Sequence, residues 1–166
     1  MQIAETERLI IRQFTEQDTD FILRQLNDES FVRNIADKQV RTREDALSYL
    51  RNGPFASYQQ LGLGLNLVQL KATGTPIGMC GILQRPELDY PDLGYAFLPD
   101  YQGQGFAQEA AEAVLKDAVT QGQSVILAVT LLTNAASYRL LERVGFELQG
   151  EMELYGKRNR LYRYQA

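Results

Sequence analysis

The stretch Pro99-Asp100-Tyr101-Gln102-Gly103-Gln104-Gly105-Phe106-Ala107 joins a predicted strand over residues 94–98 to the most clearly amphipathic segment of the chain. Apolar residues that recur every three or four positions predict a helix there, at Ala107, Ala110, Ala111, Val114, Leu115 and Ala118. Glycines at such a junction allow a tight turn and a close approach of the backbone to a ligand. The first amides of a helix have no acceptor within it and favour a bound diphosphate. The stretch therefore indicates either a phosphate site or a simple turn into a helix.

Two familiar phosphate-binding motifs do not fit this stretch. A dinucleotide fingerprint needs a third Gly or Ala where Gln108 stands, and an acidic residue at the end of the following strand, but residues 124–133 contain none. A Walker loop needs Gly-Lys followed by Ser or Thr, and the only Gly-Lys, at residues 156–157, precedes Arg158. Both a Rossmann domain and a P-loop nucleotide-binding domain are therefore excluded.

The rest of the chain reads as alternating strands and helices without repeats or linkers. Strands are predicted at residues 9–14, 61–67, 77–83, 94–98, 124–129 and 146–154, with a last one after a turn at 156–159. Helices are predicted from Thr15, from Thr42 to about 52–54, from Gly105, and over 134–144, and residues 85–92 read as a loop. This order predicts one α/β or α+β domain over residues 1–166.

The amino-acid composition argues against several classes of function. The 166 residues carry a formal net charge of −4, which argues against a general nucleic-acid binder. There is no histidine and one cysteine, Cys80, so we expect no histidine-based catalytic system, no metal site and no disulfide. No apolar run approaches the roughly 20 residues that span a bilayer, so we expect a cytoplasmic protein without membrane partners.

The spacing Gln/Arg-x-x-Gly-x-Gly/Ala, typical of acyl-CoA diphosphate sites, is met by Gln102, Gly105 and Ala107. With the opening Glu7-Arg8-Leu9-Ile10-Ile11-Arg12, the later Asn134-x-x-Ser137 and the closing Gly145-Phe146, the chain resembles the GNAT superfamily of N-acetyltransferases over nearly its whole length. It looks most similar to the branch of ribosomal-protein N-terminal acetyltransferases. The resemblance implies a mixed, mostly antiparallel sheet of six to seven strands, splayed between strands four and five and flanked by helices.

The resemblance also implies where acetyl-CoA binds. The pantetheine arm would make strand-like hydrogen bonds to Phe97 and Leu98, with Asn134 and Ser137 on its other side. Asn134 can equally serve as a helix cap, and the two roles are compatible. The diphosphate would lie over the amides of Gln102, Gly103, Gln104, Gly105, Phe106 and Ala107.

The reaction that the resemblance implies requires a base that takes a proton from the amine and a proton donor for the departing thiolate. Asp92 stands where relatives often carry Glu and is the expected base, acting through a water. Many relatives place a tyrosine acid seven residues after the motif Asn, but Leu141 occupies that position here. Ser137 is then the better matched donor, with Tyr138 and Tyr95 as weaker candidates, and Cys80 is not expected to act as a nucleophile.

These residues imply direct transfer of an acetyl group from acetyl-CoA to a primary amine in a ternary complex. The acceptor is either a protein N-terminus or a small-molecule amine, and relatives often pair, which allows a homodimer. The alternative is a regulatory module that binds acyl-CoA without catalysis, because Leu141 replaces the usual tyrosine.

Overall fold

A computed structural model describes all 166 residues and shows one sheet of eight strands in the order β1-β2-β3-β4-β5-β6-β8-β7. The strands are β1 (Gln2–Glu5), β2 (Leu9–Gln13), β3 (Leu65–Leu70), β4 (Pro76–Leu83), β5 (Asp92–Phe97), β6 (Val125–Leu131), β7 (Glu147–Leu154) and β8 (Lys157–Gln165). The helices are η1 (Glu16–Asp18), α1 (Thr19–Leu26), α2 (Glu29–Asn34), α3 (Arg43–Leu50), η2 (Arg51–Phe55), α4 (Ala56–Leu61), η3 (Pro99–Tyr101), α5 (Phe106–Thr120) and α6 (Ala135–Arg143). The predicted α/β fold is confirmed, with one strand more than the upper expected number.

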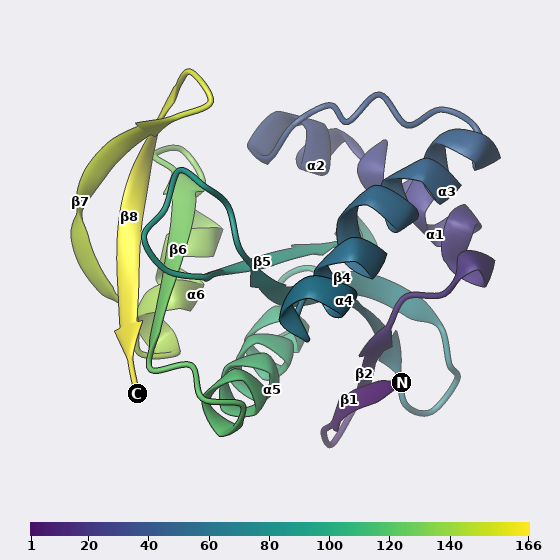
Figure 1. Ribbon diagram of the computed structural model, residues 1–166, viewed down its shortest axis with the longest axis horizontal. Helices are drawn as coiled ribbons and strands as arrows, with labels where there is room; N and C mark the ends of the chain where they lie inside the picture. The colour runs from purple at the N-terminus through teal and green to yellow at the C-terminus, as the bar shows by residue number, and fades with distance from the viewer.

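Helices cover both faces of the sheet (Figure 1). On one face, α1, α2 and α3 bury an apolar cluster against Leu67, Met79 and Leu98. On the other face, α5 and α6 bury a larger cluster that includes Phe97 and Tyr162. Along β3 and β4, neighbouring side chains belong to different clusters, Leu67 and Met79 to the first and Val68 and Cys80 to the second, because a strand sends successive side chains to opposite faces.

The sheet opens between β5 and β6, as expected. β4 and β5 pair along the whole of β5, whereas β5 and β6 are joined by the single parallel pair Asp92 and Leu127. Beyond this pair the two strands diverge, and α6 lies beside the far half of the sheet (Figure 1). The edge of β5 that faces the opening therefore keeps main-chain groups free for another chain-like partner.

Two strands differ from the predictions. The N-terminal residues form β1, which pairs antiparallel with β2 and was not predicted. The strand predicted over 61–67 begins only at Leu65, because Leu61 ends α4 and Gly62 follows with a φ of 69°, in the left-handed region. A glycine in that conformation is a common end for a helix, so the alternating leucines belong to two different elements.

The helix predicted to end near residues 52–54 continues beyond Pro54. A wide π-helical turn, η2, carries the chain through Pro54 into α4. Because proline has no amide hydrogen, it breaks the regular pattern of helical hydrogen bonds, and a local π turn absorbs the defect without ending the helix.

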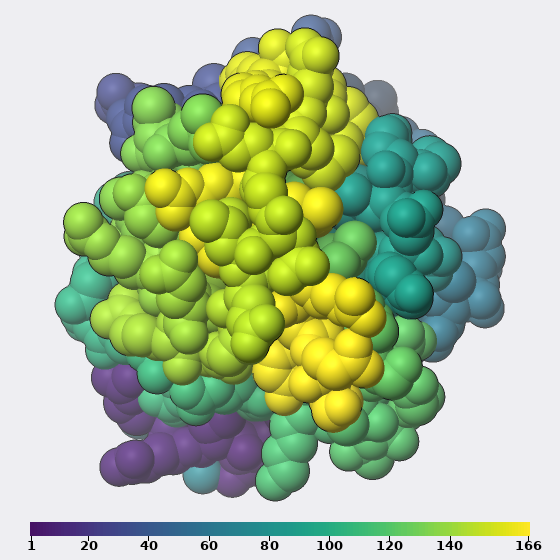
Figure 2. Space-filling model, turned by 90° about the vertical axis from the view of Figure 1, so that its left-hand side faces the viewer, coloured from purple at the N-terminus to yellow at the C-terminus, as the bar shows by residue number.

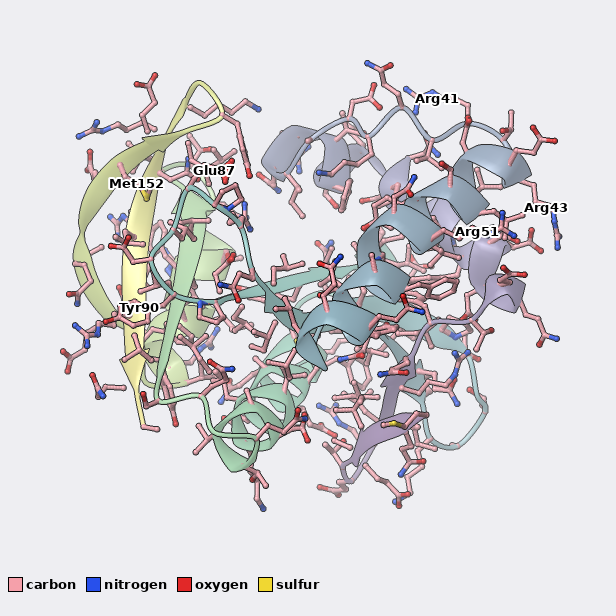
Figure 3. The ribbon with its side chains drawn as sticks, in the orientation of Figure 1. Arg41, Arg43, Arg51, Glu87, Tyr90 and Met152 are labelled. Carbon is pink, nitrogen blue, oxygen red and sulfur yellow. The ribbon has the colours of Figure 1, made fainter.

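At the other end of the sheet, the hairpin of β7 and β8 covers much of one side of the molecule (Figure 2). The segment between β4 and β5 crosses to this hairpin, and its Glu87 and Tyr90 lie beside β7 and β8 (Figure 3). The hydroxyl of Tyr155 in the hairpin turn donates to a Glu87 carboxylate oxygen at 3.4 Å. This crossing segment links the two halves of the opened sheet.

None of the helices combines the length and apolar character that crossing a bilayer requires.

Candidate active site

The loop before α5 offers a row of free amides. Gly103 and Gly105 have φ angles of 72° and 83°, a left-handed conformation that glycine adopts without strain. The amides of residues 103–108 donate no hydrogen bond within the protein, and no side chain caps the helix. The amide of Gln102 differs from the expectation, because it donates to the Pro99 carbonyl at 3.2 Å. The row of free amides is therefore shifted by one residue relative to the expectation and includes the amide of Gln108.

The Gln102 side chain holds this loop in place. Its amide nitrogen donates to the Phe97 carbonyl at 2.9 Å and to the Ser30 hydroxyl at 3.3 Å. The loop is thereby tied both to the end of β5 and to α2, on the opposite face of the sheet. Gln102, the glutamine of the acyl-CoA motif, therefore fixes the position of the loop through its side chain.

Arg8 lies beneath the same loop, a position that the sequence reasoning did not assign. Its Nη1 donates to the Gln104 carbonyl at 3.1 Å and its Nε to Glu109 Oε1 at 2.7 Å. The guanidinium stacks on the Phe106 ring, 4.2 Å from its centre. Burial raises the pKa of the Glu109 carboxyl, but hydrogen bonds from Thr6 and Arg8 outweigh it and hold this pKa below its ordinary value. Arg8 thus neutralises an acidic side chain in the first turn of α5.

The opening beside β5 presents Tyr95 and Phe97. Leu98 donates its amide to Ile77 at 2.9 Å and accepts from the Tyr101 amide at 2.9 Å, so both of its main-chain groups are used. Successive residues of a strand direct these groups to opposite edges, and the Pro91 carbonyl already accepts from β6. Phe97 therefore lies on the open edge as expected, whereas Leu98 lies on the β4 side, contrary to the expectation.

The start of α6 meets β5 across the opening. Asn134 caps α6, with its side-chain oxygen accepting from the Ser137 amide at 3.4 Å, so the capping role is observed. The Ser137 hydroxyl lies 2.6 Å from the Tyr95 hydroxyl, which is also 3.2 Å from the Ser137 carbonyl. Leu141 is 1% exposed in the apolar cluster beneath α6. Of the three proposed donors, Ser137 and Tyr95 are brought together.

Asp92 lies where β5 and β6 separate, and its environment is closed. The side chain is 0% exposed, and Arg85 donates to both carboxylate oxygens, at 2.7 and 3.1 Å. Burial raises the pKa of this carboxyl above its ordinary value, although the ion pair with Arg85 opposes the change. The expected exchange of a proton through a bridging water would require one oxygen to leave Arg85, so the role of base stays a prediction.

Cys80 is completely buried on β4 in the cluster under α5. Burial raises the pKa of its thiol, because a thiolate is poorly solvated by apolar neighbours. A buried neutral thiol is a poor nucleophile, in keeping with its omission from the catalytic residues.

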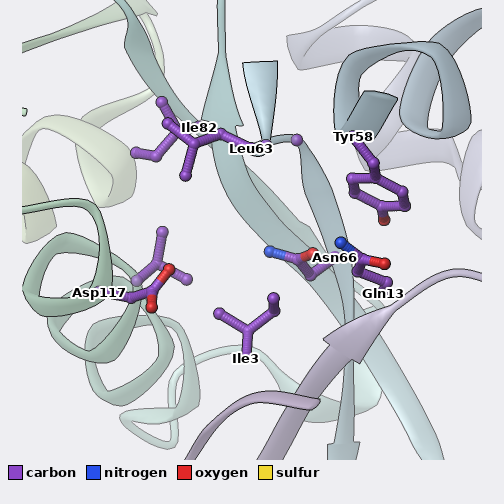
Figure 4. A pocket seen from close by; sticks show the side chains of 10 residues that line it. Ile3, Gln13, Tyr58, Leu63, Asn66, Ile82 and Asp117 are labelled. Carbon is purple, nitrogen blue, oxygen red and sulfur yellow. The ribbon is translucent and has the colours of Figure 1, made fainter. Parts of the chain in front are cut away.

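Two hollows, both partly open to solvent, lie away from these residues. One, of about 10 Å³, has room for a single water between Asn66, Gln13 and Asp117, on the face of the sheet that α5 covers (Figure 4). A wider polar hollow of about 280 Å³ lies at β7 and β8 and includes Arg163. Neither cavity contains a residue of the loop, the open edge of β5 or the start of α6. The candidate site therefore consists of the loop before α5, the open edge of β5 and the start of α6.

Comparison with known proteins identifies the family. Residues 8–147 match the family model described as an acetyltransferase (GNAT) domain. The chain is 29% identical over 160 residues to the uncharacterized N-acetyltransferase YoaA of Bacillus subtilis, covering 95% of this chain and 89% of that protein.

Solved structures agree on the fold. An acetyltransferase from Agrobacterium tumefaciens superposes with a TM-score of 0.83 at 22% identity, covering 98% of this chain and 94% of that one. The ribosomal L7/L12 alpha-N-protein acetyltransferase RimL, solved with coenzyme A, superposes with a TM-score of 0.85 at 16% identity over 99% and 98% of the two chains. The chain belongs to the GNAT family and is an acetyl-CoA-dependent N-acetyltransferase.

Proposed function

We propose that the protein binds the diphosphate of acetyl-CoA on the amides of residues 103–108 and transfers the acetyl group directly to a bound primary amine. The observation that carries this proposal is the row of unpaired amides at the N-terminus of α5, the longest helix. Such amides, with the positive end of the helix dipole, stabilise a diphosphate. Left-handed glycines at positions 103 and 105 keep side chains off this part of the loop.

The pantetheine arm would continue from the loop along the open edge of β5. The main-chain groups of Tyr95 and the amide of Phe97 face the gap and can hydrogen-bond to the pantetheine arm as a neighbouring strand would, while the Phe97 carbonyl already accepts from the Gln102 side chain. Asn134 and Ser137 line the opposite side, at the start of α6. This placement brings the thioester to the point where Ser137 and Tyr95 meet.

In the reaction, the neutral amine nitrogen attacks the thioester carbonyl carbon. A carbon–nitrogen bond forms, the carbon–sulfur bond breaks, and its electron pair leaves on sulfur. In this proposal the Ser137 hydroxyl donates a hydrogen bond to that sulfur, while the proton lost by the amine passes to water or to a base. Asp92 is the proposed base, and it must first release one oxygen from Arg85. Holding the amine and the thioester together supplies much of the acceleration.

The proposed acceptors are a peptide N-terminus or a small-molecule amine. The structural likeness to RimL, named for acetylation of a ribosomal protein's alpha-amino group, supports the peptide. A similar likeness to the microcin C7 self-immunity acetyltransferase MccE, solved with acetyl-CoA and AMP, supports the small molecule.

The test has two stages. Calorimetric titration with CoA measures binding, and release of CoA from acetyl-CoA is then followed with a panel of amines and of peptides with free N-termini. We expect binding that is weakened by Gly105→Val, because a branched side chain would force the left-handed position and crowd the row of free amides. Undetectable binding of CoA to the unmodified protein would refute the proposal.

The alternative is a module that binds acyl-CoA without turnover. It is favoured by Leu141, which fills the position of the usual tyrosine acid and is buried. Tight binding of CoA with no release of CoA for any amine or peptide in the panel would support this alternative.

A further inference from the structure

The most informative contact that the family motifs do not explain joins β5 to α6 across the opening of the sheet. The Tyr95 hydroxyl lies 2.6 Å from the Ser137 hydroxyl oxygen. We propose that Tyr95 is a positioning residue that orients the Ser137 hydroxyl towards the departing sulfur of CoA. The inference rests on the proposed function, in which Ser137 donates to that sulfur.

Both ends of this contact are held firmly by the fold. Tyr95 lies in the paired part of β5, opposite Cys80 of β4, so its position along the gap is fixed. Ser137 lies in the first turn of α6, where Asn134 accepts its amide hydrogen and fixes the start of the helix. The contact therefore has a defined geometry, as a positioning role requires.

The number of hydrogens on the two hydroxyls determines how Tyr95 orients the Ser137 hydroxyl. A serine hydroxyl carries one hydrogen, which it can send either to Tyr95 or into the gap. The Tyr95 phenol also carries one hydrogen, and Ser137 offers it two acceptors, the hydroxyl oxygen at 2.6 Å and the main-chain carbonyl at 3.2 Å. When the phenol donates to the nearer hydroxyl oxygen, the serine hydrogen is left to point at a ligand. Burial raises the pKa of Tyr95, so the phenol remains protonated and available as a donor throughout the neutral range. The same burial disfavours a tyrosinate, so Tyr95 assists through a hydrogen bond and transfers no proton.

Tyr138, the neighbouring tyrosine, does not share this role. Its ring is covered by the Arg160 guanidinium, which lies 4.0 Å from the ring centre. No hydrogen bond joins its hydroxyl to Ser137 or to any other group of the protein. Tyr138→Phe keeps the ring for Arg160 and removes only a hydroxyl, which makes it a matched control.

The test measures the pKa of the CoA thiol in the complex, which needs no acceptor. Ultraviolet absorbance of the thiolate is followed against pH, with saturating protein, for the unmodified chain and for Tyr95→Phe, Ser137→Ala, the double variant and Tyr138→Phe. Donation to the thiolate lowers the thiol pKa, so we expect Tyr95→Phe and Ser137→Ala each to raise it by about one unit. The double variant should match Ser137→Ala, and Tyr138→Phe should match the unmodified protein.

The outcomes separate this inference from the proposed function. Equal thiol pKa values for the unmodified protein and Tyr95→Phe, or additive effects in the double variant, would overturn the inference while leaving CoA binding intact. Failure of the unmodified protein to bind CoA would overturn both. Once an acceptor is known, Tyr95→Phe should lower kcat about three- to tenfold with an unchanged KM for acetyl-CoA, and a change confined to KM would also count against the inference.

Discussion

Replacing Arg8 with methionine should weaken CoA binding, although this residue is remote in sequence from the loop proposed to hold the diphosphate. Arg8 fixes the Gln104 carbonyl at 3.1 Å and neutralises Glu109, whose carboxylate lies in the first turn of α5. Methionine keeps much of the apolar stem and removes the charge. The Glu109 carboxylate would then keep its hydrogen bonds from the Thr6 hydroxyl and the main-chain amide of residue 8, but it would lie near the proposed diphosphate site without a positively charged partner.

The size of the effect follows from charge and exposure. The Arg8 and Glu109 side chains are 42% and 20% exposed, so their ion pair is partly screened and should contribute about 1–2 kcal/mol to folding. For a domain of this size, that loss lowers Tm by about 3–6 °C. Two like charges about 8 Å apart repel by about 1 kcal/mol at an effective dielectric constant of about 40. We therefore expect CoA affinity to fall about fivefold, which corresponds to about 1 kcal/mol.

The assay is a double-mutant cycle. CoA affinity by calorimetry and Tm by thermal unfolding are measured for Arg8→Met, Glu109→Gln and the double variant at low and high salt. Removing the unpaired carboxylate should restore much of the affinity, and high salt should shrink the defect of Arg8→Met. Arg51→Met is the control, because Arg51, on η2, pairs with Glu16 of η1, away from α5, and both side chains are 58% exposed (Figure 3).

Acidification gives an independent check on the same pair. Glu109 has a folded-state pKa below its ordinary value of 4.5, so its contribution to stability is present above pH 4.5 and is lost as the pH falls through the lower folded-state value. Glu109→Gln should lack this component of acid destabilisation. If Arg8→Met bound CoA as tightly as Arg51→Met does, and Glu109→Gln showed the same acid profile as the unmodified protein, the reasoning would be refuted.

Three further predictions concern stability, each read as Tm and as the midpoint of denaturant unfolding. Arg85→Met should destabilise the fold by about 3 kcal/mol, and more than Asp92→Asn does, because it leaves a fully buried carboxylate unpaired; equal losses would contradict this ranking. Gly105→Ala should cost more than Gly103→Ala: both pay about 1–2 kcal/mol for the left-handed backbone, but only at Gly105 would the new Cβ meet a guanidinium nitrogen, at 3.3 Å. Gln25→Met should stabilise by about 1 kcal/mol, because both polar atoms of this buried amide lack partners; a loss of stability would show that the amide makes a bond in solution.

The sequence alone was sufficient to predict the parts of the candidate site that are formed by residues close together in the chain. The period of the apolar residues in α5 and the glycines before it specify a helix start with free amides, because helical amides seek acceptors four residues back and the first turn has none. The Asn134 cap is equally local, since its acceptor and donor lie within one turn. The family motifs lie on these elements, so the sequence predicted the fold together with a loop that carries free amides.

Tertiary structure decided which distant groups meet. Arg8 and Glu109 are 101 positions apart, and Tyr95 and Ser137 are 42 apart, so no local pattern reveals either contact. Pairing with β4 turned Leu98 away from the gap, and burial beside Arg85 closed off a carboxylate that reads as part of an exposed loop. Helical periodicity and capping depend on hydrogen bonds between residues that are close in sequence. Strand register and helix docking depend on the packing of the whole core, and they decide which side chains meet at the opening of the sheet.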